Sequence, residues 1–126
     1  TPTWDDGRLY ALGAKGHLSC HDAATGKVIW EKNILEENET RNLQFGLCAS
    51  PLVAGEKLII TAGAKARGRN TIIAYNKLTG EIIFEFELPA NQSGVPITYM
   101  HEGKQYIVLA VGATGHPGEL VALALE

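Results

Sequence analysis

The chain has 126 residues, of which 45% are hydrophobic and 20% charged, so it can bury at least one ordinary core. Its net charge of −3 argues against a nucleic-acid surface or a polybasic membrane face, because both need clustered Lys and Arg. No apolar run approaches the ~20 residues that a membrane-spanning helix requires. The chain begins at Thr1 without an initiator Met or a signal peptide, so we expect a fragment or a processed product.

In chain order, the sequence predicts three similar β units. The first strand of each unit begins at a proline, and these strands are Pro2–Trp4, Pro51–Val53 and Pro96–Met100. The second strand lies between glycines: Arg8–Leu12, Lys57–Thr61 and Gln105–Val111. The third strands are Leu18–Asp22, Thr71–Asn76 and Leu120–Leu125, and the fourth strands are Val28–Lys32 and Ile82–Glu87. No segment has a sustained 3.6-residue period with caps, so essentially no helix is expected.

Four antiparallel strands in about 45–50 residues are typical of a propeller blade. The predicted fold is therefore all-β, a partial β-propeller of about two and three-quarter four-stranded antiparallel blades, at approximately residues 1–48, 49–94 and 95–126. Such a set cannot close a ring of 4–8 blades. We therefore expect the C-terminal part of a larger ring, with Glu126 close to a genuine C-terminus. The missing blades of the parent chain, or other copies of this chain, would cover the open blade faces.

An eleven-residue phrase occurs twice, at Cys20–Trp30 and at Ala74–Phe84. In both copies Thr-Gly begins three residues after an Asp or Asn, and a large aromatic residue lies four residues after the glycine. Gly26 and Gly80 allow the positive φ of a tight turn, and the Asp or Asn side chain can accept hydrogen bonds from the turn's N–H groups. Trp30 and Phe84 are suited to fill the space between blades.

Polar residues of the loops are the remaining candidates for a binding site. The basic segment Lys65–Arg69 is interpreted as a solvated hairpin tip, with anion or partner binding as the alternative. The long connection Asn33–Leu47 contains the acidic stretch Glu36–Glu39. The same connection holds three further polar residues that can face a central pocket: Arg41, Asn42 and Gln44.

Histidine and cysteine patterns do not predict a metal site. His17 and His21 lie four apart on a predicted strand, about 13 Å from each other, which is too far for a shared ion. His101 is expected to be solvated at a turn. His116 lies in the last hairpin, where a functional role is the alternative to a solvated one. Cys20 and Cys48 lack the pattern of a disulfide framework and are interpreted as two small buried thiols.

The repeated phrase resembles the tryptophan-docking repeat of the quinoprotein-like propeller family, also called PQQ-like repeat propellers. The repeat of that family is Ala-x-Asp-x-x-Thr-Gly-x-x-x-Trp. The first copy here has Cys20 in place of Ala, and the second has Asn76 in place of Asp and Phe84 in place of Trp. The resemblance implies that Trp30, and Phe84 without a hydrogen bond, pack on the adjacent blade.

A second resemblance concerns the last unit. Pro96–Val108 looks like the last blade of PQQ-dependent alcohol and glucose dehydrogenases, and Glu119–Leu125 is similar to their terminal strand. Between them, Gly112–Gly118 is shorter than the glycine-rich loop expected there. This resemblance implies an oxidoreductase acting on an alcohol or sugar, with PQQ and Ca²⁺ bound by the full-length protein.

The chain itself offers no match to the catalytic positions of those enzymes. It has no adjacent Cys pair, and its three Asp residues are Asp5, Asp6 and Asp22. No catalytic or metal residue is therefore assigned within the chain, and its cofactor-binding residues stay unassigned. The alternative function is a cofactor-free propeller that binds proteins, similar to the outer-membrane protein assembly lipoprotein. Either reading implies a periplasmic or secreted protein.

Overall fold

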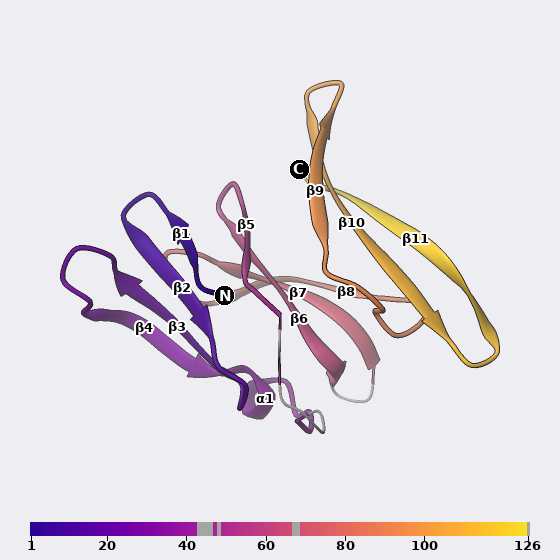
Figure 1. The fold of residues 1–126 in the computed structure, drawn as a ribbon, viewed down its shortest axis with the longest axis horizontal. Coiled ribbons are helices and arrows are strands. Elements are labelled where there is room, and N and C mark those ends of the chain that lie inside the picture. The colour runs from indigo at the N-terminus through magenta and orange to yellow at the C-terminus, as the bar shows by residue number, and fades with distance from the viewer. Residues whose placement is uncertain (43–46, 48, 67–68, 126) are drawn as a thin grey trace. The chain divides into compact units, whose positions relative to one another are not determined.

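The computed structural model describes residues 1–42, 47, 49–66 and 69–125, with the backbone alone for residues 62–66 and 69. The regular secondary structure of the described chain consists of antiparallel strands and one short helix (Figure 1). It divides into two compact units, Thr1–Glu87 and Leu88–Glu126. The fold class is the partial propeller that the sequence predicted.

The first unit holds two four-stranded sheets. The first sheet has the order β1-β2-β3-β4 and consists of β1 (Thr3–Asp5), β2 (Arg8–Leu12), β3 (His17–Asp22) and β4 (Val28–Asn33). The second has the order β5-β6-β7-β8 and consists of β5 (Leu52–Ala54), β6 (Lys57–Ala66), β7 (Arg69–Asn76) and β8 (Ile82–Glu87). All neighbours are antiparallel, and each strand follows the previous one, as in a meander.

The core of the first unit lies between these two sheets. Alternate residues of the strands face it, in the period of two that a pleated strand imposes. The cluster is Tyr10, Leu18 and Cys20 from the first sheet, Leu58, Ile60, Ile73 and Tyr75 from the second, and Ile34, Leu35 and Leu47 from the connection. Burial of these apolar faces joins the two sheets into one unit.

One helical turn departs from the expectation of essentially no helix. α1 (Ile34–Glu37) follows β4 directly, at the bottom of the first unit in Figure 1. Asn33 caps it, because its side chain accepts hydrogen bonds from the N–H groups of Leu35 and Glu36 at 3.0 and 3.3 Å. Ile34 and Leu35 are buried in the core. The helical turn thus places two apolar residues, which follow the edge strand β4, in the core between the two sheets.

The second unit has one sheet, with the order β11-β10-β9, formed by β9 (Ile97–His101), β10 (Lys104–Ala113) and β11 (His116–Leu125). Three strands are found in its described residues, as the sequence predicted. Beyond β9, the segment 91–93 continues beside β10: Ser93 N–H donates to Ala110 O at 2.9 Å, and Gly112 N–H donates to Asn91 O at 2.8 Å. Tyr99 and Tyr106 stack across β9 and β10 with ring centroids 5.2 Å apart.

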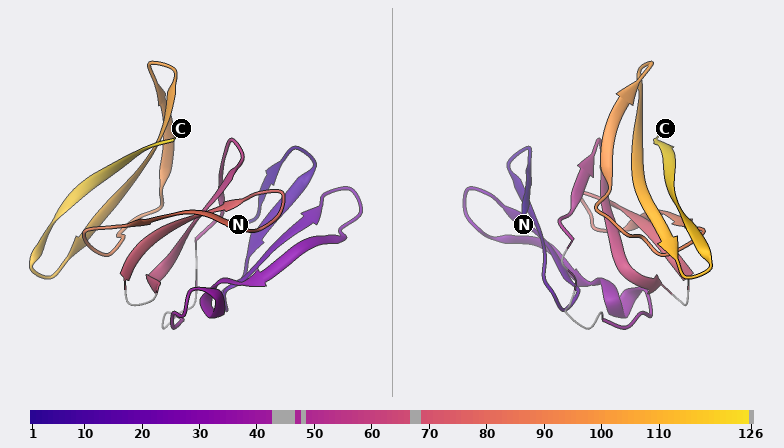
Figure 2. Two further views of the ribbon diagram at one scale, coloured as in Figure 1. Left: turned by 180° about the vertical axis from the view of Figure 1, so that it is seen from behind. Right: turned by 45° about the vertical axis from the view of Figure 1, so that its right-hand side comes forward.

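In the two later hairpins, the strands extend beyond the predicted ends at Thr61 and Val111. β6 and β7 pair as far as Ala66 and Arg69. β10 and β11 pair as far as Ala113 and His116. Figure 2 shows both hairpins as long, twisted ribbons.

Candidate functional site

The two repeated phrases form the same tight turn, at Asp22–Gly26 and at Asn76–Gly80, called here the first and the second Thr-Gly turn. Gly26 and Gly80 have φ of +73° and +77°, a region that glycine enters without steric cost. The predicted role of these glycines in the turn is confirmed.

Side-chain oxygens hold both turns. In the first turn, Asp22 Oδ1 accepts from Ala24 N–H at 3.0 Å, Thr25 N–H at 2.8 Å and the Thr25 hydroxyl at 2.9 Å. The backbone N–H of Thr25 is the main cause that lowers the pKa of Asp22. In the second turn, Asn76 Oδ1 accepts from the N–H groups of Leu78 and Thr79 at 2.8 and 3.2 Å.

Trp30 of the first sheet packs on the second Thr-Gly turn. Its indole N–H donates to the carbonyl of Lys77 at 3.1 Å. A Cβ built on Gly80 would lie 2.8 Å from Trp30 Cδ2 and Cε3, so only glycine leaves room for the ring. Tyr10, whose ring centroid is 6.3 Å from that of Trp30, donates its hydroxyl to the same Lys77 carbonyl at 3.1 Å.

Two charged side chains of the first sheet, Asp5 and Arg8, reinforce this contact. Lys77 Nζ pairs with Asp5 Oδ2 at 2.8 Å, with both side chains largely buried, and the hydrogen bond to Asp5 raises the pKa of Lys77. Arg8 donates to the carbonyl of Leu78 at 3.4 Å. The first sheet therefore contacts the second turn through the Tyr10–Trp30 pair, one ion pair and three hydrogen bonds to backbone carbonyls.

Gly26 and Phe84, the counterparts of Gly80 and Trp30, lack such a contact among the described residues. A Cβ on Gly26 would meet none of them within 4 Å, so the first Thr-Gly turn is open there. Phe84, the counterpart of Trp30, is 46% exposed and stacks on Phe86 with centroids 6.4 Å apart. Both aromatic residues were predicted to fill a space between blades. Trp30 fills such a space between the two sheets, whereas Phe84 lies half-exposed on β8.

Histidines of the first sheet bind polar partners on their own sheet. His17 Nε2 lies 3.1 Å from Glu31 Oε2 across β3 and β4. His21 Nε2 lies 2.9 Å from Ser19 Oγ, and its Nδ1 lies 3.3 Å from the Gly26 carbonyl. His17 and His21 thus have separate partners.

Histidines of the second unit are exposed or half-exposed. His101 ends β9, and its side chain is 64% exposed, 4.0 Å from that of the adjacent Glu102, so the prediction of a solvated side chain is confirmed. His116 begins β11, where its Nε2 lies 2.9 Å from Glu119 Oε1. Across the described residues, no group of three His, Cys, Asp or Glu side chains is placed to hold a metal ion.

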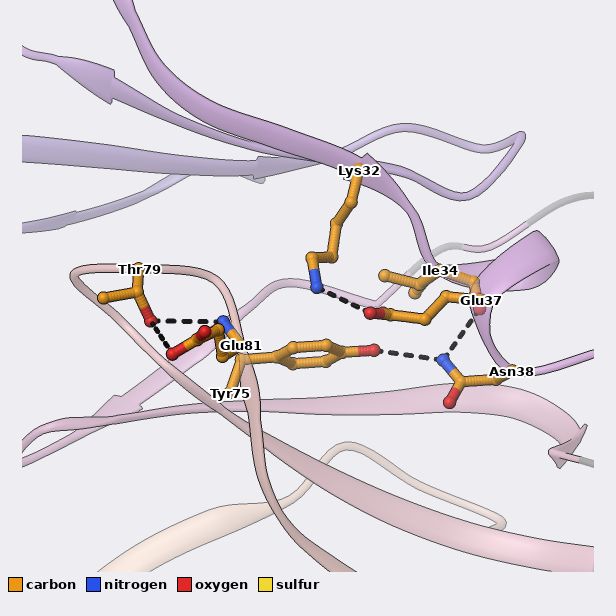
Figure 3. A network of polar contacts seen from close by, with 7 residues as sticks. All are labelled: Lys32, Ile34, Glu37, Asn38, Tyr75, Thr79 and Glu81. Carbon is orange, nitrogen blue, oxygen red and sulfur yellow. Dashed lines mark hydrogen bonds and ion pairs between the residues drawn. The ribbon is translucent and has the colours of Figure 1, made fainter.

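A polar network links the connection after β4 to the second sheet (Figure 3). Lys32 Nζ pairs with Glu37 Oε1 at 2.7 Å and lies 5.1 Å from the centre of the Tyr75 ring. Asn38, just after α1, donates through Nδ2 to the Ile34 carbonyl at 2.8 Å and to the Tyr75 hydroxyl at 3.1 Å. Burial raises the pKa of Tyr75, so its hydroxyl stays protonated.

Sequence reasoning missed Asn38 and Tyr75, although it singled out the connection. Asn38 was grouped with an acidic stretch, yet it is wholly buried. Among the predicted pocket residues, Asn42 donates to the Ala14 carbonyl at 2.9 Å, and Arg41 is exposed. Gln44 lies outside the described residues, as do Arg67 and Gly68 of the predicted basic tip.

Of the two cysteines, Cys20 is a buried free thiol in the core, as predicted, and burial raises its pKa. Cys48 lies outside the described residues. No helix in the described part of the chain is long and apolar enough to cross a membrane.

Comparison with known proteins places these features in a family. The family model described as outer membrane protein assembly factor BamB, a model of PQQ-like repeats, matches residues 1–126. The chain belongs to the PQQ-like repeat family of quinoprotein-like propellers. Its repeated Thr-Gly turns are thus turns of a propeller repeat.

Relatives and solved structures agree with this family. The chain is 32% identical over 116 residues to the quinoprotein glucose dehydrogenase of Escherichia coli (strain K12), a match that covers 83% of the chain and 14% of that protein. Quinohemoprotein alcohol dehydrogenase from Comamonas testosteroni shares the fold with a TM-score of 0.62 at 20% identity, over 86% of this chain and 21% of that one. BamB from Moraxella catarrhalis gives 0.55 at 16% identity, over 93% and 34%. The chain therefore spans a small part of the proteins that it matches.

Proposed function

We propose that the chain is part of the propeller of a PQQ-dependent alcohol or sugar dehydrogenase. The observation that carries the proposal is its 32% identity to a quinoprotein glucose dehydrogenase over 83% of the chain. The resemblance of Pro96–Val108 to the last blade of such enzymes supports it. That segment forms β9 and the first half of β10.

The described residues do not fit a quinone or Ca²⁺ site. Among the three Asp residues of the sequence, Asp5 is paired with Lys77, Asp22 holds a turn, and Asp6 lies in the β1–β2 turn with φ of +44°. The sequence also lacks adjacent cysteines. We therefore propose no catalytic step through residues of this chain, and the proposal assigns the redox chemistry to other parts of the full-length protein.

The proposed role of the chain is to build the propeller ring through tryptophan docking. The contact of Trp30 with the second Thr-Gly turn joins one sheet to the next and supports this role. We propose that further blades of the same protein cover the open first turn and the half-exposed Phe84. We also propose a periplasmic or secreted location.

The direct experiment is reconstitution of the full-length protein with PQQ and Ca²⁺, followed by dye-linked oxidation of glucose and of primary alcohols. Bound quinone absorbance and turnover are the expected results. Matched controls omit PQQ or remove Ca²⁺ with a chelator, and both should abolish turnover. A protein that binds no quinone and oxidises none of these substrates would exclude the dehydrogenase.

A second candidate is a cofactor-free scaffold that binds other proteins. Two observations favour it: the description of the matched family, and a fold shared with BamB over 93% of the chain. In this case, site-specific cross-linking of the full-length protein in cells should capture outer-membrane assembly proteins whether PQQ is present or absent. Capture of no specific partner, together with PQQ-dependent turnover, would favour the dehydrogenase.

A further inference from the structure

The side chain of Asn38 has one polar atom that the polar network leaves unused. Asn38 is wholly buried, and its Oδ1 has no hydrogen-bond partner among the residues that the structure describes. A buried acceptor without a donor is costly, and in native proteins such atoms usually bind an ordered water or another ligand. The surroundings of Asn38 therefore need an occupant.

The orientation of the Asn38 amide is fixed by its neighbours. Nδ2 lies 2.8 Å from the Ile34 carbonyl oxygen, which can only accept, so the group facing it must be the NH₂. The second hydrogen of Nδ2 points at the Tyr75 hydroxyl at 3.1 Å. Figure 3 shows Oδ1 directed away from both partners. Exchanging oxygen and nitrogen would place two acceptors against each other at Ile34.

The chemistry of the amide oxygen and its surroundings limits the occupant. Oδ1 is an acceptor only, so it repels an anion that has no proton to donate. Among the described residues, no group of three His, Cys, Asp or Glu side chains is placed to hold a metal ion, so a cation would lack further ligands. A neutral O–H donor has neither conflict.

We propose that Asn38 Oδ1 anchors a buried ligand that donates an O–H hydrogen bond, either a water molecule or a hydroxyl of a polyol. The proposal does not depend on whether the protein is a dehydrogenase.

High-resolution crystal structures of the full-length protein test the proposal. Crystals grown and frozen without polyols should show an ordered oxygen at about 2.7–3.2 Å from Asn38 Oδ1 if the ligand is water. If the oxygen appears only after a soak in glycerol or glucose, the ligand is a polyol hydroxyl. Oδ1 contacting protein groups alone would overturn the proposal. A metal ion with several oxygen ligands at about 2.0–2.6 Å would also overturn it.

Two variants separate the anchor from its neighbour. Tyr75→Phe removes a hydroxyl that Asn38 Nδ2 binds but leaves Oδ1 intact, so the ordered oxygen should persist. Asn38→Leu has a similar size and no acceptor, so the oxygen should be lost. If this variant does not fold, Asn38→Asp should retain the oxygen, because burial favours the protonated carboxyl, which donates to the Ile34 carbonyl and keeps an acceptor on its other oxygen. Loss of the oxygen in Tyr75→Phe or in Asn38→Asp, or its persistence in Asn38→Leu, would overturn the assignment to Asn38.

Discussion

The first and the second Thr-Gly turns share a sequence pattern and a backbone conformation, and they differ in what packs on them. Gly26 and Gly80 have nearly the same φ, and Asp22 and Asn76 accept hydrogen bonds from corresponding N–H groups. Trp30 covers the second turn, whereas the first is open. Local sequence therefore determines the turn, and the position of the turn in the array determines its contact.

The largest expected effect comes from removing the side chain that makes the two turns different. Trp30→Ala should lower the free energy of unfolding by about 3 kcal/mol, at the lower end of buried Trp→Ala changes because the ring is only partly buried. Urea unfolding of the full-length protein measures it. Trp4→Ala is the control, since Trp4 is 65% exposed and should cost less than about 1 kcal/mol. Equal costs would mean that Trp30 has no special role in joining the sheets.

Alanine at the two glycines tests the difference directly. Both substitutions force a Cβ into the left-handed region, at about 1–2 kcal/mol each. Gly80→Ala also drives the Cβ to 2.8 Å from Trp30, which adds about 1 kcal/mol of overpacking, the low end for such changes. In the 126-residue chain, Gly80→Ala should therefore be the more destabilising of the two.

The same pair in the full-length protein tests the proposed ring. If another blade docks an aromatic ring on Gly26, the costs of Gly26→Ala and Gly80→Ala should become equal within about 0.5 kcal/mol. A first turn that stays insensitive to Gly26→Ala at full length would contradict docking there.

The parts of the structure set by short-range sequence were predictable, and those set by long-range contacts were not. Gly26, Gly80 and Trp30 belong to a repeated pattern. The role of the glycines in a turn, and of Trp30 in packing between sheets, could therefore be inferred from the sequence alone. Pairing of Asn38 with Tyr75 joins residues 37 positions apart and has no local signal. Helix α1 did have a local signal in the sequence. Asn33 is followed three residues later by Glu36, which is a pattern typical of a helix N-terminus.

The predicted strand ends in the later hairpins were wrong for a related reason. Gly112–Gly118 is rich in glycine and contains Pro117, which is typical of a loop, yet the strands pair as far as Ala113 and His116, on either side of a turn at Gly115. Continued strand pairing satisfied the backbone groups better than a loop. Composition alone therefore placed the strand ends too early.

The shared carbonyl of Lys77 gives a smaller and more specific effect. Trp30→Phe and Tyr10→Phe each remove one donor and leave the other, so each should cost about 1 kcal/mol. The double variant leaves that carbonyl without either donor and should cost more than the two single changes together. A double-mutant cycle in urea measures the excess. Simple additivity would show that water replaces both donors.

The smallest effect distinguishes the turns by their caps, because Asp22 of the first turn can titrate and its counterpart Asn76 cannot. The folded-state pKa of Asp22 is lowered by the turn's donors, so its stabilising bonds are fully present above the unfolded pKa of about 3.9 and are lost as pH falls through the lower folded value. Below about pH 4, the amide ¹H shifts of Ala24 and Thr25 should move with one midpoint, whereas that of Leu78, bound to the neutral Asn76, should not. Thr79 is not used as a reference, because its hydroxyl donates to the Glu81 carboxylate at 3.2 Å. Asp22→Asn should abolish the movement in the first turn and leave the second unchanged. A midpoint at or above the unfolded pKa would show that Asp22 does not hold the turn in solution, and that Thr25 and Gly26 suffice to form it.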